Sequence, residues 1–252
     1  MQGCRQAIRW SDAEGVECDG TTGGDRYRFG RRHWLRDGRS IPYQWRRRDR
    51  PRPVDGFDVT DPTACVAAAD GVLRGHGRVD VLCNIAGVGA VGDIVDATSA
   101  DWERVFGVNV FGVANMSRAV LPAMRRAGRG AIVNACSVAA SVGLVERAVY
   151  SASKGAVLSL TKAMAADEVR YGVRVNCVSP GTVRSPWVER LVASTPDPER
   201  AMEALRRRQP LGRLVTCEEV ADAVCYLAAE STFTTGADFL LDGGITNVRL
   251  VD

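Results

Sequence analysis

The chain has 252 residues, of which 46% are hydrophobic and 25% charged, and its formal net charge is +3. This composition is ordinary for a globular domain and excludes a disordered, collagen-like or coiled-coil chain. No apolar run approaches the ~20 residues that span a bilayer, and the first residues lack a signal-peptide core, so we expect a cytoplasmic protein without a membrane partner. The eight cysteines are scattered without a CxxC pair, which predicts buried free thiols and no metal site.

The charge is divided unevenly along the chain. Residues 1–53 contain 13 arginines, no lysine and 7 acidic residues, a net charge of +6, whereas the remainder carries −3. Such a split is found in basic arms that bind nucleic acid. Because no aromatic platform or recognised nucleic-acid fold accompanies it, we expect no nucleic-acid partner.

From about residue 54 the sequence alternates between apolar strands and amphipathic helices. A strand-like piece ends at 58–61, and further strands are predicted at 79–84, 131–136, 173–178 and 237–241. Helices are predicted at 62–77, 100–127, 148–171 and 217–229, the last opened by a capping-box pattern from Thr216 to Glu219. This alternation predicts an α/β fold with a single doubly wound parallel sheet, Rossmann-like, in one domain over 1–252.

The first 53 residues break this rhythm, since they show neither period 2 nor period 3.6. By length, a first strand, a helix and a second strand belong here. We therefore expect an anomalous first βαβ segment over 1–53 and a regular domain over 54–252.

A tyrosine and a lysine, Tyr150 and Lys154, are four residues apart on the predicted helix 148–171, and this spacing places them on one face. An ammonium group near a phenol stabilises the phenolate, which suits Tyr150 to acid-base chemistry. Ser137 follows a predicted strand, at the sheet edge where open α/β folds bind their ligands. Together these residues predict a catalytic site.

Three further motifs occur in order: Asn84-Ile85-Ala86-Gly87 after a strand, Asn109 within a helix, and Pro180-Gly181-Thr182-Val183-Arg184-Ser185 after another strand. With Ser137, Tyr150 and Lys154, they make residues 55 to 246 resemble the short-chain dehydrogenase/reductase family. The resemblance implies an oxidoreductase that transfers a hydride between NAD(P) and a secondary alcohol or ketone. It further implies that Tyr150 exchanges the proton, Ser137 binds the substrate oxygen, Lys154 holds the ribose and Asn109 keeps a water in the proton path.

The resemblance also implies the cofactor contacts and the assembly. The residues matched to cofactor contacts are Asp58, Val59, Asn84, Ala86, Gly87, Tyr150, Lys154, Pro180, Gly181, Val183 and Ser185. The resemblance favours NAD as the cofactor. NADP remains possible, because the residue that reads the ribose 2′ position falls within the anomalous segment. Family resemblance predicts a homotetramer that packs the helices 100–127 and 148–171 between subunits.

The glycine-rich turn of the family, TGxxxGxG, is expected near residue 20, where the chain has Thr22-Gly23-Gly24-Asp25-Arg26-Tyr27-Arg28. That turn needs glycines so that backbone N–H groups approach the pyrophosphate. If residues 25–28 are encoded GAC-CGG-TAT-CGG followed by T, reading one base later gives Thr-Gly-Ile-Gly. We hypothesise that a frame shift runs from here to about Val54. The alternative to an active enzyme is a catalytically impaired relic that folds and assembles without its cofactor.

Three arginines, Arg147, Arg190 and Arg208, occupy positions where substrate-binding residues fall in this family, beside Ser137 and Tyr150. The guanidinium fork suits a carboxylate. The surrounding sequence resembles a subgroup containing type 2 3-hydroxybutyrate dehydrogenase and dehydrogenases of sugar acids such as 2-keto-3-deoxy-L-fuconate. We therefore expect a small hydroxy acid or sugar acid as substrate, with a neutral sugar or polyol as the open alternative.

Overall fold

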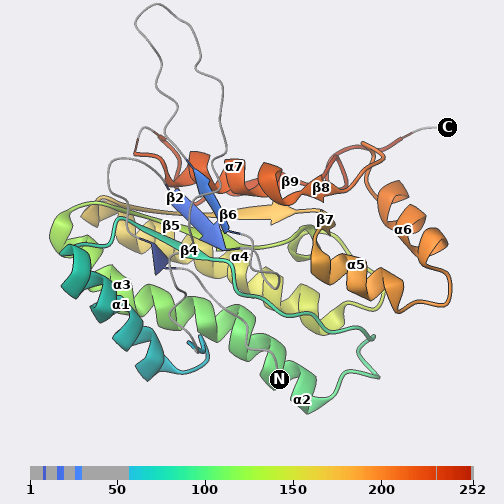
Figure 1. The fold of residues 1–252 in the computed structure, drawn as a ribbon, viewed down its shortest axis with the longest axis horizontal. Coiled ribbons are helices and arrows are strands. Elements are labelled where there is room, and N and C mark those ends of the chain that lie inside the picture. The colour runs from blue at the N-terminus through green and yellow to red at the C-terminus, as the bar shows by residue number, and fades with distance from the viewer. Residues whose placement is uncertain (1–7, 10–15, 20–25, 30–56, 231, 251–252) are drawn as a thin grey trace, which may run out of the picture.

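The computed structural model describes residues 8–9, 16–19, 26–29, 57–230 and 232–250. Its centre is a five-stranded sheet in the order β1-β4-β5-β6-β9 (Figure 1). The strands are β1 (Ile8–Arg9), β4 (Val81–Asn84), β5 (Gly130–Ala135), β6 (Val173–Pro180) and β9 (Asp238–Leu241). β4, β5, β6 and β9 are parallel, which confirms the predicted α/β class, while β1 pairs antiparallel with β4.

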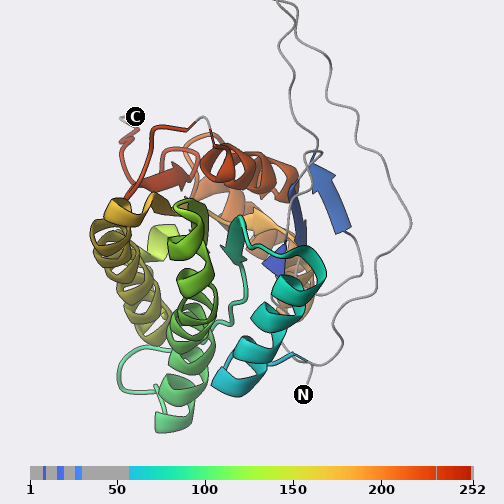
Figure 2. The same cartoon turned by 90° about the vertical axis from the view of Figure 1, so that its left-hand side faces the viewer.

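Helices cover both faces of the sheet (Figures 1 and 2). On one face lie α1 (Pro62–His76), α3 (Gly112–Ala127) and α4 (Ala148–Glu168), and on the other lies α7 (Cys217–Ala228). Alternate residues along the strands serve the two layers: Leu82 and Ile132 pack with the first group, Val81 and Val133 with α7. This period of two is what a sheet buried on both faces requires.

The predicted helix 100–127 is divided in the structure. It comprises α2 (Ser99–Phe106), a π-helical turn (Gly107–Phe111) and α3. Helix α3 then lies very close to Val59, because a Cβ placed on Gly112 would be 2.7 Å from Val59 Cγ2. The glycine therefore allows an approach that any larger residue would prevent.

The strand-like piece predicted to end at 58–61 lies largely outside the described residues, and its expected end, from Asp58 to Asp61, is a turn. The Asp58 carboxylate accepts a hydrogen bond from the Thr60 amide at 2.9 Å, and Asp61 N donates to Asp58 O. Asp61 also caps α1 through Thr63 N at 2.8 Å. Aspartate side chains bond neighbouring backbone groups in this way, which favours a turn over a strand.

Other elements were not anticipated from the sequence. They are β2 (Val16–Asp19), β3 (Arg26–Phe29), a 3₁₀ turn (Val138–Ala140), a second 3₁₀ turn (Val169–Tyr171), β7 (Val183–Arg184), α5 (Pro186–Ala193), α6 (Pro198–Arg207) and β8 (Val215–Thr216). The signals for α5 and α6 were present, since Ser185 and Asp197 cap helices whose first residue is proline.

In the N-terminal segment, β2 and β3 form an antiparallel pair. The glycines of residues 22–24 and the interval 30–53, where the first helix and second strand were expected, lie outside the described residues.

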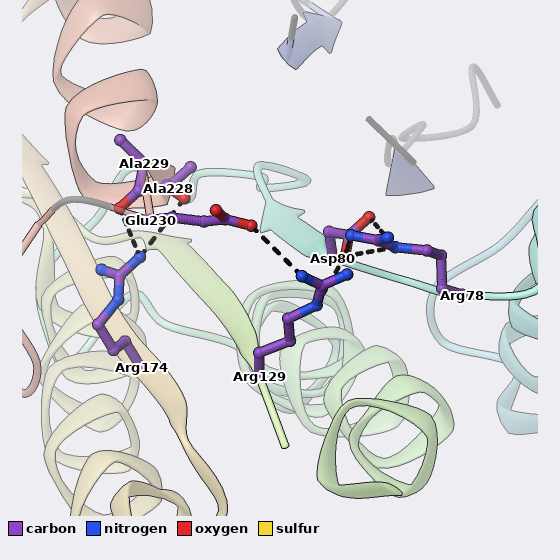
Figure 3. A network of polar contacts seen from close by, with 7 residues as sticks. All are labelled: Arg78, Asp80, Arg129, Arg174, Ala228, Ala229 and Glu230. Carbon is purple, nitrogen blue, oxygen red and sulfur yellow. Dashed lines mark hydrogen bonds and ion pairs between the residues drawn. The ribbon is translucent and has the colours of Figure 1, made fainter. Parts of the chain in front are cut away.

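Polar side chains gather at the ends of the strands opposite to the predicted site (Figure 3). Arg174, near the start of β6, donates to Leu227 O at 2.7 Å and Ala229 O at 2.9 Å and so caps the C-terminus of α7. Arg129 lies 3.9 Å from both Asp80 and Glu230. This end of the sheet is thus closed by structural ion pairs and caps.

Within the described part of the chain, no helix has both the length and the apolar character that crossing a membrane requires. The six described cysteines are free thiols. Cys65, Cys83, Cys136 and Cys177 are buried, as predicted, whereas Cys217 and Cys225 are only partly covered.

Candidate active site

The carboxyl ends of β4 and β5 and the first turns of α4 converge around Gly87. A Cβ placed on Gly87 would lie 3.5 Å from Asn109 Oδ1 and 3.6 Å from Lys154 Nζ. Three residues that the sequence places far apart are therefore neighbours. The absence of a side chain at 87 leaves the space between the amide and the ammonium group open.

Asn109 lies in the π-helical turn and is buried. Its Nδ2 donates to Val88 O and to Ser153 Oγ, both at 3.0 Å, and its Oδ1 accepts from Val88 N at 2.8 Å. Both amide hydrogens are thus used to fix the segment after β4 to α4. The second lone pair of Oδ1 is the acceptor that a water in the site would use.

Lys154 is only 4% exposed, although it carries a charge. Its Nζ donates to Ala135 O at 2.7 Å and lies 5.7 Å from the centre of the Tyr150 ring. A buried ammonium is costly unless it has partners, so the carbonyl at the end of β5 holds it in place. The structure thus brings the tyrosine and lysine together on one face of α4, as their spacing predicts.

Ser137 directly follows the last residues of β5 and caps the 3₁₀ turn 138–140. Its Oγ accepts from Ala139 N at 3.2 Å, and the residue is 8% exposed. The cap orients the hydroxyl at the carboxyl end of the sheet, where its O–H donor is suited to an oxygen of a ligand.

Cys136 is a neighbour of the site that sequence reasoning left among the buried thiols. Its Sγ lies 3.3 Å from Lys154 O. A hydrogen bond with Cys177 lowers the pKa of the Cys136 thiol, and the same contact together with burial raises the pKa of Cys177. Because both thiols are buried, they pack β5 and β6 against α4.

The predicted cofactor residues follow the same edge of the sheet. Ala86 and Gly87 come after β4, Pro180 ends β6, and Gly181 follows it. Val183 lies in β7, and Ser185 caps α5 by accepting from Val188 N at 3.4 Å. Val59 is fully buried and its carbonyl accepts from Asn115, so its side chain belongs to the core beside the Asp58 turn.

Asn84 differs from the other predicted cofactor residues because its side chain is turned into the core. Its Nδ2 donates to Asn134 Oδ1 at 2.8 Å and to Ser117 Oγ at 3.3 Å. The residue is 1% exposed, so a ligand at this edge would meet its backbone and not its amide.

A dinucleotide fits the described part of this edge. A Cβ on Gly181 would lie 2.5 Å from Gln209 Oε1, so that position has room for backbone only, while Gly87 leaves the Lys154 ammonium approachable. Lys154 can donate to ribose hydroxyls. The expected pyrophosphate turn, around residues 22–28, falls largely outside the described residues.

Two of the three predicted substrate arginines act on one another. Arg147 precedes α4 and donates to Glu146 O at 3.2 Å, and Arg208 ends α6. Burial and the charge of Arg208 lower the pKa of Arg147, while Tyr150 and Glu146 act in the opposite sense. Arg190 lies in the last turn of α5. Arg147, Arg208 and Tyr150 therefore share one electrostatic environment.

Trp187 lies near the segment that follows Gly87, a position that was not predicted from the sequence. Its ring atoms Cζ2 and Cη2 lie 3.5 and 3.6 Å from where a Cβ of Gly89 would be, and the residue is half exposed. The next residue, Ala90, is 3.5 Å from Arg147 through its carbonyl oxygen. The Trp187 ring and the Arg147 guanidinium thus both lie near the same short segment after Gly87.

A family model described as enoyl-(acyl carrier protein) reductase matches residues 48–246 of the chain. Dehydrogenase/reductase SDR family member 6 of Danio rerio is 46% identical over 177 residues, 69% of this chain and 72% of the relative. The chain belongs to the short-chain dehydrogenase/reductase family. The match begins near the point where the sequence becomes regular.

Two further similar proteins are dehydrogenases named for acids. The 2-keto-3-deoxy-L-fuconate dehydrogenase of Xanthomonas campestris is 43% identical over 194 residues, 76% of this chain and 63% of the relative. A gluconate 5-dehydrogenase of Burkholderia cenocepacia, solved with NADP and tartrate, superposes with a TM-score of 0.71 at 34% identity, over 77% of this chain and 74% of that one. The fold of the described region is therefore that of known short-chain dehydrogenases.

Proposed function

We propose that the chain transfers a hydride between NAD(P), with NAD preferred, and the secondary alcohol or ketone of a small hydroxy acid or sugar acid. The observation that carries the proposal is the meeting of Asn109 and Lys154 at Gly87, with the Tyr150 ring beside the Lys154 ammonium group. The charges of Tyr150 and Arg208 both act on Arg147. Family membership supports the reaction class, and the arginines support an acidic substrate.

In the proposed mechanism, side chains of this protein transfer the proton of the substrate hydroxyl group. NAD(P), when bound, supplies or accepts the hydride. In the oxidation direction, Tyr150 as phenolate takes the hydroxyl proton of the substrate, and Lys154 stabilises that phenolate through its charge. Ser137 donates to the same substrate oxygen and orients it. Asn109 Oδ1 holds the water that returns the proton to solvent. In the reduction direction each of these steps is reversed.

The carboxylate preference rests on the like charges of Arg147 and Arg208. The charge of Arg208 acts on Arg147, and an anion bound near both side chains would be attracted by each guanidinium group. The crystal structure of the gluconate dehydrogenase contains tartrate, a dicarboxylate, and the fuconate enzyme acts on a sugar acid. For this chain we propose the same class, a hydroxy acid, without choosing between aliphatic and sugar acids.

The proposed setting is a homotetramer in the cytoplasm. An apolar groove between α3 and α4, lined by Leu121, Pro122, Leu160 and Met164 and edged by Arg118 and Arg125, supports contact between subunits. The buried thiols, among them Cys65 and Cys177, suit a reducing compartment.

A second candidate is a relic without catalysis, and it rests on one observation. The sequence from Thr22 to Arg28 lacks the spaced glycines that would admit a pyrophosphate. Each lost hydrogen bond to a charged group costs about 1.5–3 kcal/mol, so several together lower cofactor affinity by decades.

NADH titration followed by fluorescence separates the two candidates. The chain is compared with a version whose residues 22–29 read Thr-Gly-Gly-x-Thr-Gly-Ile-Gly with an in-frame first helix. The relic expects the chain itself to bind NADH weakly or not at all, whereas the enzyme proposal expects it to bind NADH at micromolar concentration and to turn over. The version with the glycine turn is expected to bind and turn over, and its Tyr150→Phe variant to lose turnover but retain NADH. A Tyr150→Phe variant that keeps more than a few per cent of activity would contradict the assigned proton path.

A further inference from the structure

Beneath the site, a chain of buried polar side chains links the four elements that carry it. The members are Asn84 of β4, Ser117 of α3, Asn134 of β5 and Thr161 of α4. None is more than 2% exposed. A polar group is rarely placed at such depth unless its partners are fixed.

Asn134 is the centre of this network. Its Oδ1 accepts from Asn84 Nδ2 at 2.8 Å, and its Nδ2 donates to Thr161 Oγ1 at 2.9 Å. Asn84 Nδ2 also donates to Ser117 Oγ at 3.3 Å, and Thr161 Oγ1 donates to Val157 O at 2.8 Å. The hydrogen bonds therefore run without interruption from α3 through two strands to α4.

Each member of the network is close in the sequence to a residue of the site. Asn84 is three residues before Gly87, and Asn134 is three residues before Ser137. Thr161 follows Lys154 by seven residues, which is about two helical turns. Ser117 similarly follows Asn109 by eight residues, so every arm of the network leads to one site residue.

Apolar packing resists separation of these elements but permits small sliding, because it has no direction. Hydrogen bonds are directional, and a fully satisfied buried network selects one alignment. The alignment of β5 with α4 matters here, since Lys154 Nζ bonds to Ala135 O, the carbonyl next to Asn134. A shift of less than 1 Å between the two elements would move the ammonium relative to Ser137.

We propose that Asn134 and Thr161 are positioning residues, which set the alignment of the Gly87 segment, Ser137 and Lys154 without touching a ligand. This inference rests on the proposed function for its catalytic consequence. Its structural consequence, that the network holds the two site segments 85–92 and 136–142 in place, is independent of turnover.

The test compares Thr161→Val with Thr161→Ser. Valine has nearly the shape of threonine but removes the acceptor of Asn134 Nδ2, whereas serine keeps it. We expect Thr161→Val to raise amide hydrogen exchange in both 85–92 and 136–142, and Thr161→Ser to keep it near that of the parent chain. Ser117→Ala removes only the longest hydrogen bond of the network, so we expect it to give a smaller rise in amide exchange. It replaces Thr161→Val as the test variant if that variant folds poorly.

A matched control lies one strand away. Asn176 of β6 is also fully buried, and it donates to Thr234 O at 2.9 Å and accepts from Ala237 N at 3.0 Å. Asn176→Leu therefore removes a comparable buried amide that leads away from the site. We expect it to raise exchange around 234–237 and to leave 85–92 and 136–142 unchanged.

In the version of the chain that turns over, Thr161→Val is expected to lower kcat by about tenfold while KM changes by less than about twofold. Asn176→Leu is expected to leave kcat unchanged. Unaltered exchange in both site segments, or the same kcat loss in Asn176→Leu, would overturn the inference. Absence of turnover in the parent would instead contradict the proposed function, and exchange would still decide on the network.

Discussion

At the scale of single residues, the proposed preference for an acidic substrate rests on Arg147 and Arg208. Arg147 is half-buried beside Tyr150, and burial together with Arg208 lowers its pKa. A guanidinium remains charged despite such a shift, so the repulsion persists until an anion binds. The proposed carboxylate preference therefore depends on both residues and not on either alone.

Replacing these arginines tests that preference. We expect Arg147→Ala and Arg208→Ala each to raise KM for a hydroxy acid by one to two decades, because a charge-assisted contact is worth about 1.5–3 kcal/mol. Cofactor affinity should stay constant. Arg206→Ala is the matched control, since Arg206 is exposed and lies 3.6 Å from Glu203 on the same helix. Steady-state kinetics on an acid and on an uncharged alcohol measure both effects. Equal losses on the alcohol would assign the arginines a structural role.

At the scale of elements, the positions of most strands and helices were predictable because period and caps are local signals. The helix 62–77 and the capping box at Thr216 were found within a residue of their observed bounds. The π-helical turn at Asn109 was not predicted, because an extra residue in one helical turn leaves no trace in a 3.6-residue pattern.

The capping box of α7 makes a pH-dependent contribution to stability. Glu219 is held by Arg213 and by the amide of Thr216, and these contacts lower its pKa to about 2 from the ordinary 4.5. A carboxylate whose folded pKa is depressed stabilises the protein above about pH 4.5, and this contribution is lost as the pH falls towards about 2.

We therefore expect Glu219→Ala to destabilise the chain at pH 7 by about 0.5–2 kcal/mol, the usual worth of a helix cap, and by progressively less below pH 4.5. Denaturant unfolding at pH 7, 4 and 3 measures the difference. Glu218→Ala, on the same turn but outside the capping box, is the control and should change stability little. A Glu219→Ala deficit that stays constant with pH would show that the carboxylate charge is not involved.

At the scale of the whole molecule, the sequence predicted which motifs gather at one edge of the sheet better than it predicted the packing between distant loops. Motifs at the carboxyl ends of parallel strands must meet at one edge, so Gly87, Ser137 and Lys154 were expected together and the structure brings Gly87 beside Lys154. The Trp187 contact with Gly89 joins two such loops across the sheet, and no local pattern encodes it. Long-range packing of this kind depends on the fold as a whole.

Assembly likewise depends on long-range features of the molecule. Helices α3 and α4 lie side by side on the outer face of the sheet (Figure 2), and their groove exposes Leu121 and Leu160. Arg125 bonds to Glu168 of α4 and stacks 4.6 Å from the Tyr171 ring, so the charged edge of the groove is already fixed in the monomer. A preformed apolar surface with an ordered rim loses little entropy on association.

We expect light scattering at micromolar concentration to give a molar mass of about four times 27.1 kDa for the chain. Leu121→Glu should give a smaller species, because it places a charge in the centre of the groove. Val66→Glu, on the exposed side of α1 where valine is 51% exposed, is the matched control and should leave the mass unchanged. A monomer in the parent chain would contradict the tetramer. An intact tetramer in Leu121→Glu would place the interface elsewhere, since a buried unpaired carboxylate in the groove costs several kcal/mol and would dissociate subunits held by it.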